Sequence, residues 1–181
     1  MTNNKTIRLQ IIKKRWSIKP NIKTKLDHII YTKTLNYILS FNPKKYIALY
    51  WPIENEVDSI ALIYELINRH YKICLPYIHN NKMVFKPIHS IHFEYEYWKN
   101  MRQPKNKTVI NGDDIELMIV PLIGFNKTNH RLGYGFNYYN DFLHWYNRIR
   151  TIGIAYNFQN NDEFTVSRYD KILNKIITDE T

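Results

Sequence analysis

One segment of the sequence with residues suited to chemistry is YWPIENEVD, over 50–58. It places two carboxylates, Glu54 and Glu56, directly after a short apolar run. These carboxylates can serve a ligand, or they can stabilise the start of a helix through the helix dipole. The residue types alone leave both interpretations open.

A second segment, PLIGFNKTNHRLGYGFNYYN over 121–140, combines Arg131 with Gly133, Gly135 and a pair of tyrosines. Glycines let a backbone approach a phosphate closely, and the free N–H groups at a following helix start can bind an anion. A Gly-x-Gly pair by itself often marks a plain turn, but the neighbouring arginine and the expected helix favour phosphate binding. A third segment, over 152–159, is apolar and is expected to belong to the core.

The elements that must position these segments follow from the hydrophobic pattern. We expect helices over 3–19, 22–40, 57–70 and 138–149, and strands over 46–52, 72–77, 83–87, 116–125 and 151–156. Pro20 is expected to end the first helix, and the segments 88–114 and 126–137 are expected to be irregular, the former with at most one short strand.

Strands that alternate with helices indicate a mostly parallel sheet covered on both faces. The sequence therefore predicts a Rossmann-like, three-layer α/β/α domain over 1–181, with basic helices over 1–42 and an α/β core over 43–181. In such open sheets, ligands bind beyond the carboxyl ends of the strands, where both segments fall.

The charge of the chain is concentrated near its start. Among its 181 residues the net charge is +10, and residues 1–45 hold 11 lysines and arginines against the single acid Asp27. This excess of positive charge favours an anionic partner, which can be a nucleic acid, a nucleotide phosphate or a polycarboxylate. Alternatively, the basic residues form a solvated helix face. Because no nucleic-acid reader motif or interleaved aromatic pattern accompanies the bases, a nucleic-acid-binding module is the least favoured of these hypotheses.

Other features of the sequence exclude several classes of protein. No apolar run approaches the roughly 18 residues that a membrane span needs, and the first ten residues have no apolar signal core. Cys74 is the single cysteine and lies in an apolar stretch, so we expect a core residue in a cytoplasmic protein. The seven histidines have no metal-ligand spacing, so no zinc site is expected.

The segment RLGYGFNYY over 131–139 resembles the signature of the 5-formyltetrahydrofolate cyclo-ligases, also called methenyltetrahydrofolate synthetases. Further features of that family occur in the same order along almost the whole chain, most weakly over 88–112. They are the basic N-terminal segment with Arg8 and Arg15, ALYWP over 48–52, NEVD over 55–58, Leu75-Pro76, DIELMIVPLIGFN over 114–126, TIGIAY over 151–156 and YDKILNKIIT over 169–178.

The resemblance implies ATP-dependent cyclisation of 5-formyltetrahydrofolate, which can be polyglutamylated, to 5,10-methenyltetrahydrofolate, with Mg²⁺ as cofactor. It implies a cytoplasmic monomer with no nucleic-acid or membrane partner. It also implies that Arg131 and Tyr138 are catalytic and that Trp51, Glu56 and Tyr138 bind folate. The implied ATP-binding residues are Lys5, Arg8, Arg131, Leu132, Gly133, Tyr134, Gly135, Tyr138 and Tyr139. Asp170 is the implied Mg²⁺ ligand, and Asn140 and Asp141 are weaker candidates.

Three positions depart from the family pattern. Asn137 replaces a glycine, Asn140 replaces an aspartate, and Asn4 stands where the family has a lysine four positions before Arg8, with Lys5 displaced by one. All three lie on the nucleotide side of the implied site. A second hypothesis is therefore a catalytically weakened folate-binding relic of the family, which turns over slowly or not at all.

Overall fold

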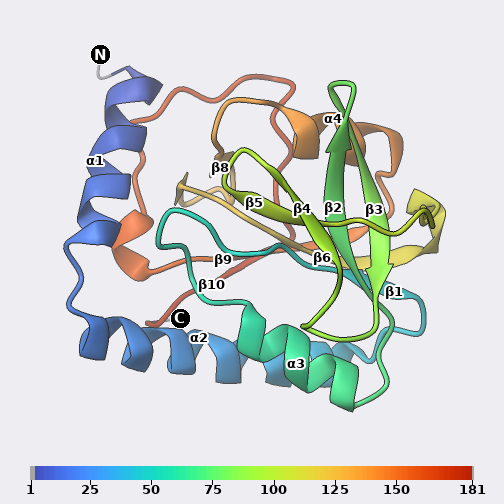
Figure 1. Ribbon diagram of the computed structural model, residues 1–181. Helices are drawn as coiled ribbons and strands as arrows, with labels where there is room; N and C mark the ends of the chain where they lie inside the picture. The colour runs from blue at the N-terminus through green and yellow to red at the C-terminus, as the bar shows by residue number, and fades with distance from the viewer. Residues whose placement is uncertain (1–2, 181) are drawn as a thin grey trace.

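A six-stranded sheet forms the centre of the computed structural model, which describes residues 3–180 (Figure 1). Its spatial order is β10-β9-β6-β1-β2-β3, and every neighbouring pair is parallel except the antiparallel pair β2 and β3. The strands are β1 (Tyr46–Ala48), β2 (Ile73–His79), β3 (Lys82–Ile88), β6 (Ile115–Val120), β9 (Arg150–Ile154) and β10 (Lys175–Ile177).

The order of the strands reverses at the centre of this sheet. The first three strands extend from β1 toward one edge, and the next three extend from β6 toward the other edge. This is the doubly wound arrangement, in which a crevice forms at the carboxyl ends of the two central strands. The predicted mixed α/β fold with a mostly parallel sheet is confirmed.

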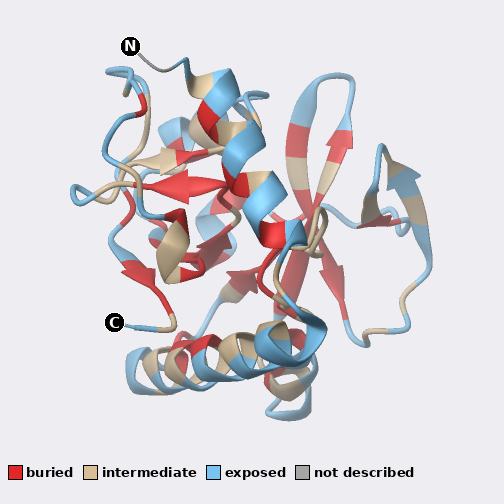
Figure 2. Ribbon diagram, turned by 90° about the vertical axis from the view of Figure 1, so that its left-hand side faces the viewer, coloured by how far each residue is buried: buried red, intermediate tan, exposed pale blue. Residues whose placement is uncertain are grey.

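Helices cover both faces of the sheet. Helices α2 (Pro20–Phe41) and α3 (Ile60–Asn68) pack on one face, and α4 (Tyr138–Trp145) packs on the other (Figure 1). The central strands are almost completely buried, as Figure 2 shows, because both faces are covered. Pro20 does not itself end the preceding helix, which stops at Trp16; it is the first residue of α2, where its missing N–H has no helical partner to lose.

Helix α1 (Asn4–Trp16) packs apart from the helices that cover the two faces of the sheet. Its residues Ile7 and Ile11 form a separate buried cluster with residues that include Leu132 and Phe164. The Asn4 side chain donates to the Thr165 carbonyl oxygen at 2.9 Å and accepts from the Thr165 N–H at 2.8 Å. These contacts place α1 beside two short strands, β7 (Gly124–Phe125) and β8 (Arg131–Leu132), which form a small antiparallel pair.

Two predictions about secondary structure were wrong. The segment 88–114 contains two strands where at most one was expected, because β4 (Tyr95–Trp98) and β5 (Met101–Pro104) form an antiparallel hairpin, and a 3₁₀ turn follows at Gly112–Asp114. The strand predicted over 116–125 is broken after Val120, since Pro121 has no N–H to donate to the sheet.

The remaining elements have different lengths from those predicted. The expected loop over 126–137 contains β8, the strand at β1 is only three residues long, and a 3₁₀ turn follows β9 at Asn157–Gln159. Within the described residues, no helix is long and apolar enough to cross a membrane.

Candidate active site

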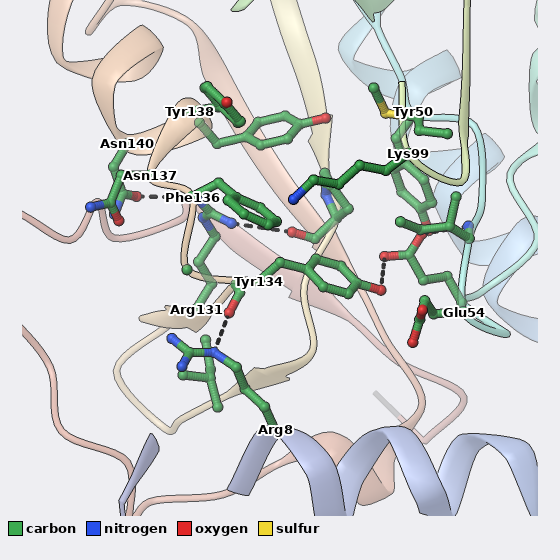
Figure 3. Close-up of a pocket in the computed structure, with 18 of the residues that line it drawn as sticks. Arg8, Tyr50, Glu54, Lys99, Arg131, Tyr134, Phe136, Asn137, Tyr138 and Asn140 are labelled. Atoms are coloured by element: carbon green, nitrogen blue, oxygen red, sulfur yellow. Dashed lines mark hydrogen bonds between the residues drawn. The ribbon is translucent and has the colours of Figure 1, made fainter. Parts of the chain in front are cut away.

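A pocket of about 350 Å³ lies at the carboxyl ends of β1 and β6, the two central strands. Tyr50 and Trp51 follow β1, and Pro121 follows β6. Helix α1 contributes Arg8, and the tip of the β4–β5 hairpin contributes Lys99. The reversal of strand order therefore coincides with the two segments that the sequence singled out, and Figure 3 shows how their side chains converge.

The glycine loop, defined here as residues 133–137, forms one side of the pocket. Gly135 has φ +94°, a conformation that other residues rarely adopt. Asn137 also has a left-handed backbone, with φ 59°, and asparagine tolerates this region better than most residues. Asn137, which stands where the family pattern described above has a glycine, therefore adopts a left-handed backbone in this chain.

Arg8 fixes the position of this loop. Its Nε donates to the Gly133 carbonyl oxygen at 2.7 Å. The rest of the Arg8 guanidinium lies near Gly135, because a Cβ added at Gly135 would lie 3.7 Å from Arg8 Nη2. The Arg8 guanidinium of helix α1 thus lies against the backbone of Gly133 and Gly135, which the sequence analysis predicts to bind phosphate.

Arg131 lies under the loop with incomplete hydrogen bonding. Its Nη2 donates to Asn140 Oδ1 at 3.2 Å, its Nη1 donates weakly to the Pro121 carbonyl oxygen at 3.4 Å, and its guanidinium carbon lies 5.3 Å from the centre of the Tyr139 ring. Its buried Nε has no hydrogen-bond partner among the described residues. Burial lowers the pKa of Arg131 to about 10, so the side chain remains a cation at neutral pH and is suited to an anionic ligand.

At the opposite end of the pocket, Glu56 is a buried carboxyl, 4% exposed. Its Oε2 accepts from the Ile53 N–H at 2.9 Å, and its Oε1 accepts from the Tyr134 hydroxyl at 3.2 Å. The Tyr134 oxygen in turn accepts from Arg15 Nη2 at 3.0 Å. Burial raises the pKa of Glu56 to about 7, and Arg15 opposes that rise, so the carboxyl is poised between its two protonation states near neutral pH.

Asp170 is a carboxylate of the pocket that interacts electrostatically with Arg131. Its Oδ1 accepts from Asn140 Nδ2 at 2.8 Å, and its Oδ2 accepts from the Ser167 N–H at 2.7 Å. Because Asp170 carries a negative charge and the amide of Asn140 does not, Asp170 is the better candidate metal ligand of the two. Residues 3–180 contain no group of three or more histidine, cysteine or acidic residues that could hold a metal ion. One carboxylate nevertheless suits Mg²⁺, which is commonly held by one or two carboxylates together with substrate phosphates.

Aromatic side chains complete the pocket. Trp98 meets Phe136 edge to face at a centroid distance of 5.7 Å and meets Tyr138 at 5.6 Å. Trp51 lies on the other side and packs edge to face against Phe93 at 5.3 Å. Such a cleft can hold a flat heterocycle between rings.

The structure brings together most of the residues that the sequence analysis assigned to the site. Those that line the pocket are Arg8, Trp51, Glu56, Arg131, Leu132, Gly133, Tyr134, Gly135, Tyr138, Tyr139, Asn140 and Asp170. Two do not, since Lys5 and Asp141 are exposed and lie outside it. Asn4 lines the pocket instead of Lys5, because one helical position turns a side chain by about 100°.

Sequence reasoning missed several residues that line the pocket. Tyr50, Trp98 and Lys99 are the main examples, whereas Glu54, which the sequence analysis did consider as a ligand-binding carboxylate, also lines the pocket. The signal that could have found two of them is the pattern of the β4–β5 hairpin, in which a two-residue turn, Lys99-Asn100, separates residues 95–98 from 101–104.

Comparisons with known proteins match these features. Residues 1–179 match the sequence model of the 5-formyltetrahydrofolate cyclo-ligase family. The sequence is 33% identical over 177 residues to a Mycoplasma pneumoniae protein named 5-formyltetrahydrofolate cyclo-ligase, covering 96% of this chain and 97% of that protein. A protein of the same name from Mycoplasma genitalium is 31% identical, with 98% of each chain covered.

Comparisons with solved structures agree with these sequence comparisons. The structure of a 5,10-methenyltetrahydrofolate synthetase from Mycoplasma pneumoniae superposes with a TM-score of 0.82 at 30% identity, covering 97% of this chain and 98% of that one. The NMR structure of the Aquifex aeolicus 5,10-methenyltetrahydrofolate synthetase gives a TM-score of 0.84 at 24% identity, covering 98% of this chain and 90% of that one, and supports the fold alone.

Proposed function

We propose a mechanism for this chain from the premise that it belongs to the 5-formyltetrahydrofolate cyclo-ligase family. The chain is a ligase that uses ATP to cyclise 5-formyltetrahydrofolate to 5,10-methenyltetrahydrofolate, with release of ADP and phosphate. The predicted family and reaction are confirmed. What remains to be proposed is where each substrate binds and which residues act on it.

The reaction needs activation because an amide oxygen is a poor leaving group. Transfer of the γ-phosphoryl group of ATP to the formyl oxygen releases ADP and makes that oxygen a leaving group. The N10 lone pair then attacks the formyl carbon, the carbon–oxygen bond breaks with departure of phosphate, and N10 loses its proton. The protein must align the two substrates, neutralise the charge on the transferring group and exclude water.

The folate is proposed to bind between Glu56 and the aromatic side chains of Trp51 and Tyr138. A pterin ring presents N–H donors on one edge, and a buried carboxyl that accepts only two protein hydrogen bonds can accept more. The aromatic rings on either side suit the flat ring system. This buried carboxyl, in a pocket that aromatic rings also line, is the single observation that carries the folate assignment.

ATP is proposed to bind along the glycine loop, with its phosphates near Arg8 and Arg131. The loop glycines permit close approach of the backbone, and Arg131 Nε is buried without a partner. Leu132 and Tyr139 flank this site, and Tyr134 connects it to Glu56 through its hydroxyl. Arg131 and Tyr138 are the proposed catalytic residues, since Arg131 supplies charge to the transferring group and Tyr138 separates the two substrates.

Asp170 is the proposed ligand for Mg²⁺, together with the phosphates of ATP. When bound, the metal ion would neutralise phosphate charge during the transfer. Asp170 is held for this role by the Ser167 N–H and by Asn140. Asn140 is proposed to orient both Asp170 and Arg131 and not to bind the metal itself.

An absorbance assay tests the activity. With 5-formyltetrahydrofolate, Mg²⁺ and ATP, the chain should produce the near-ultraviolet absorbance of the methenyl product, and without ATP it should not. Arg131→Met should remove most of this activity, whereas Arg148→Met, which removes an exposed arginine outside the pocket, should keep it. A folded chain that gives no ATP-dependent product would leave the folate-binding relic as the better hypothesis. Calorimetric binding of folate without binding of Mg²⁺-ATP would then support that relic.

Further properties are proposed on separate grounds. A monomeric enzyme is proposed on the family resemblance of the sequence alone. A single domain is supported by the contacts that join α1 to residues near position 165. A cytoplasmic location is supported by one buried, unpaired cysteine. Polyglutamylated folate is the proposed substrate form, because an acidic tail suits a chain with a net charge of +10.

A role without nucleic acid is supported by the use of the N-terminal bases inside the fold. Arg8 and Arg15 bond to residues of the pocket, and Lys23 forms an ion pair with Asp27. Lys33 donates to two carbonyl oxygens near residue 178. Much of the basic charge is therefore already used by the protein.

A further inference from the structure

Lys99 is a cation of the pocket that the sequence analysis did not identify. It is the first of the two turn residues of the β4–β5 hairpin, with φ 51°. Its Nζ lies 3.6 Å from the centre of the Phe136 ring, in the glycine loop, and 4.9 Å from the Trp98 ring. Figure 3 shows its side chain extending across the pocket toward Phe136, with the amine at the end nearest the loop.

The ammonium of Lys99 has no polar partner in the part of the chain that the structure describes. The ion pairs there are Lys23–Asp27, Arg69–Glu65 and Lys127–Asp162, and no hydrogen bond involves the Lys99 side chain. By contrast, Arg8 and Arg131 both donate hydrogen bonds to the protein. Lys99 is exposed, so its three N–H donors have no protein partner to give up before they bind a ligand, and the rings of Trp98 and Phe136 lie beside its ammonium.

The hairpin that carries Lys99 is fixed at its base. Gln103 is buried, its Oε1 accepts from the Ile78 N–H at 2.9 Å, and its Nε2 donates to the Ile78 carbonyl oxygen at 3.4 Å. These bonds tie β5 to β2 of the central sheet. At the other end, Trp98 contacts Phe136, so the turn is held over the glycine loop from the side opposite Arg8.

We propose that Lys99 is a phosphate-binding residue of the ligase reaction, which moves from the Phe136 ring to a terminal phosphate oxygen when ATP occupies the pocket. The inference rests on the proposed placement of ATP at the glycine loop. A lysine suits this position because its charge is compact and its flexible stem can follow a phosphoryl group as it transfers. Arg8 and Arg131 then neutralise the phosphates from the loop side, and Lys99 does so from the hairpin side.

The proposal is tested with Lys99→Met, which keeps an apolar stem against Phe136 but removes the charge. Lys105→Met is the matched control, because Lys105 is an exposed lysine just after the same hairpin and outside the pocket. Calorimetry with ATP, AMP and 5-formyltetrahydrofolate as separate ligands measures each affinity. Steady-state assays give the KM for ATP, and Lys99→Arg tests whether a cation alone restores it.

Loss of one charged contact to phosphate should weaken ATP binding by about tenfold to a hundredfold in Lys99→Met. The affinities for AMP and for folate should remain within about twofold of those of the unmodified chain, because neither ligand has the terminal phosphate that Lys99 is proposed to bind. Lys105→Met should match the unmodified chain, and Lys99→Arg should recover most of the affinity for ATP.

Three results would overturn the proposal. Unchanged ATP affinity in Lys99→Met would exclude the contact. Equal losses for ATP and AMP, with a lower melting temperature, would assign Lys99 a structural role, and a loss confined to folate would assign it to the other substrate. If the unmodified chain bound no ATP, the proposed nucleotide site would itself be wrong, a result distinct from a loss seen only in the variant.

Discussion

Replacing Glu56 by glutamine should change the pH dependence of stability in a defined way. The carboxyl is 4% exposed, and burial raises its pKa from the ordinary value of 4.5 to about 7. Glutamine has nearly the same shape as a protonated glutamic acid, and its amide oxygen can still accept from the Ile53 N–H. The variant therefore resembles the neutral form of the native side chain at every pH.

The sign and size follow from this difference in pKa. A carboxyl with a higher pKa in the folded chain binds its proton more tightly there, so its contribution to stability is complete below about pH 4.5 and is lost as the pH rises through about 7. The two pKa values correspond to about 3 kcal/mol at pH 8 and above. Glu56→Gln should consequently match the native chain at pH 4.5 and exceed its stability by about 3 kcal/mol at pH 8.5.

Urea unfolding at several pH values measures the difference directly. A thermal melt should show it as a rise in Tm of roughly 6–12 °C for the variant at pH 8.5, for a chain of this length. Other titrating groups cancel in the comparison because both chains share them. Parallel stability curves for the two chains between pH 4.5 and 8.5 would refute the reasoning, and they would place the ionised Glu56 in a well-compensated environment.

Two further substitutions have defined outcomes. Gly153→Ala in β9 would place a Cβ 2.6 Å from Leu122 Cδ2 in the core, so urea unfolding should show a loss of about 1–3 kcal/mol, and an unchanged midpoint would contradict this crowding. Asn140→Asp would place a second carboxylate beside Asp170, now 2.8 Å from the Asn140 amide, so we expect lower stability without metal. The Mg²⁺ concentration for half-maximal activity should also fall by roughly fivefold to tenfold in Asn140→Asp, as one added carboxylate ligand would give. Asp141→Ala is the control and should leave that concentration unchanged, since Asp141 is exposed outside the pocket; a shift there instead would assign the metal to Asp141.

The parts of the site that could be predicted are those encoded by local sequence. Gly135 and Asn137 stand where the backbone is left-handed, and Arg131 precedes them within a few residues. The alternation of strands and helices placed this loop and Glu56 at the same edge of the sheet. Both predictions needed only spacing along the chain and a general rule of α/β folds.

The parts that could not be predicted depend on contacts between distant segments. Tyr134 joins Arg15 to Glu56 across 119 and 78 positions, and neither pairing has a signature in the sequence. The β4–β5 hairpin was missed because β4 alternates only between exposed and half-buried residues and β5 does not alternate at all, which gives a weak hydrophobic period. Lys99 could be assigned to the pocket only after that hairpin was located.

The pairing of Asn4 with Thr165 has a consequence for the synthesis of the chain on the ribosome. At typical rates of 5–20 residues per second, helix α1 is made roughly 10–30 s before the segment that covers it. During that interval Ile7 and Ile11, both buried in the final structure, have no partner at Phe164. The apolar side of α1 is then available to chaperones, and the nucleotide side of the pocket, which includes Arg8, is completed only after about nine-tenths of the chain has emerged.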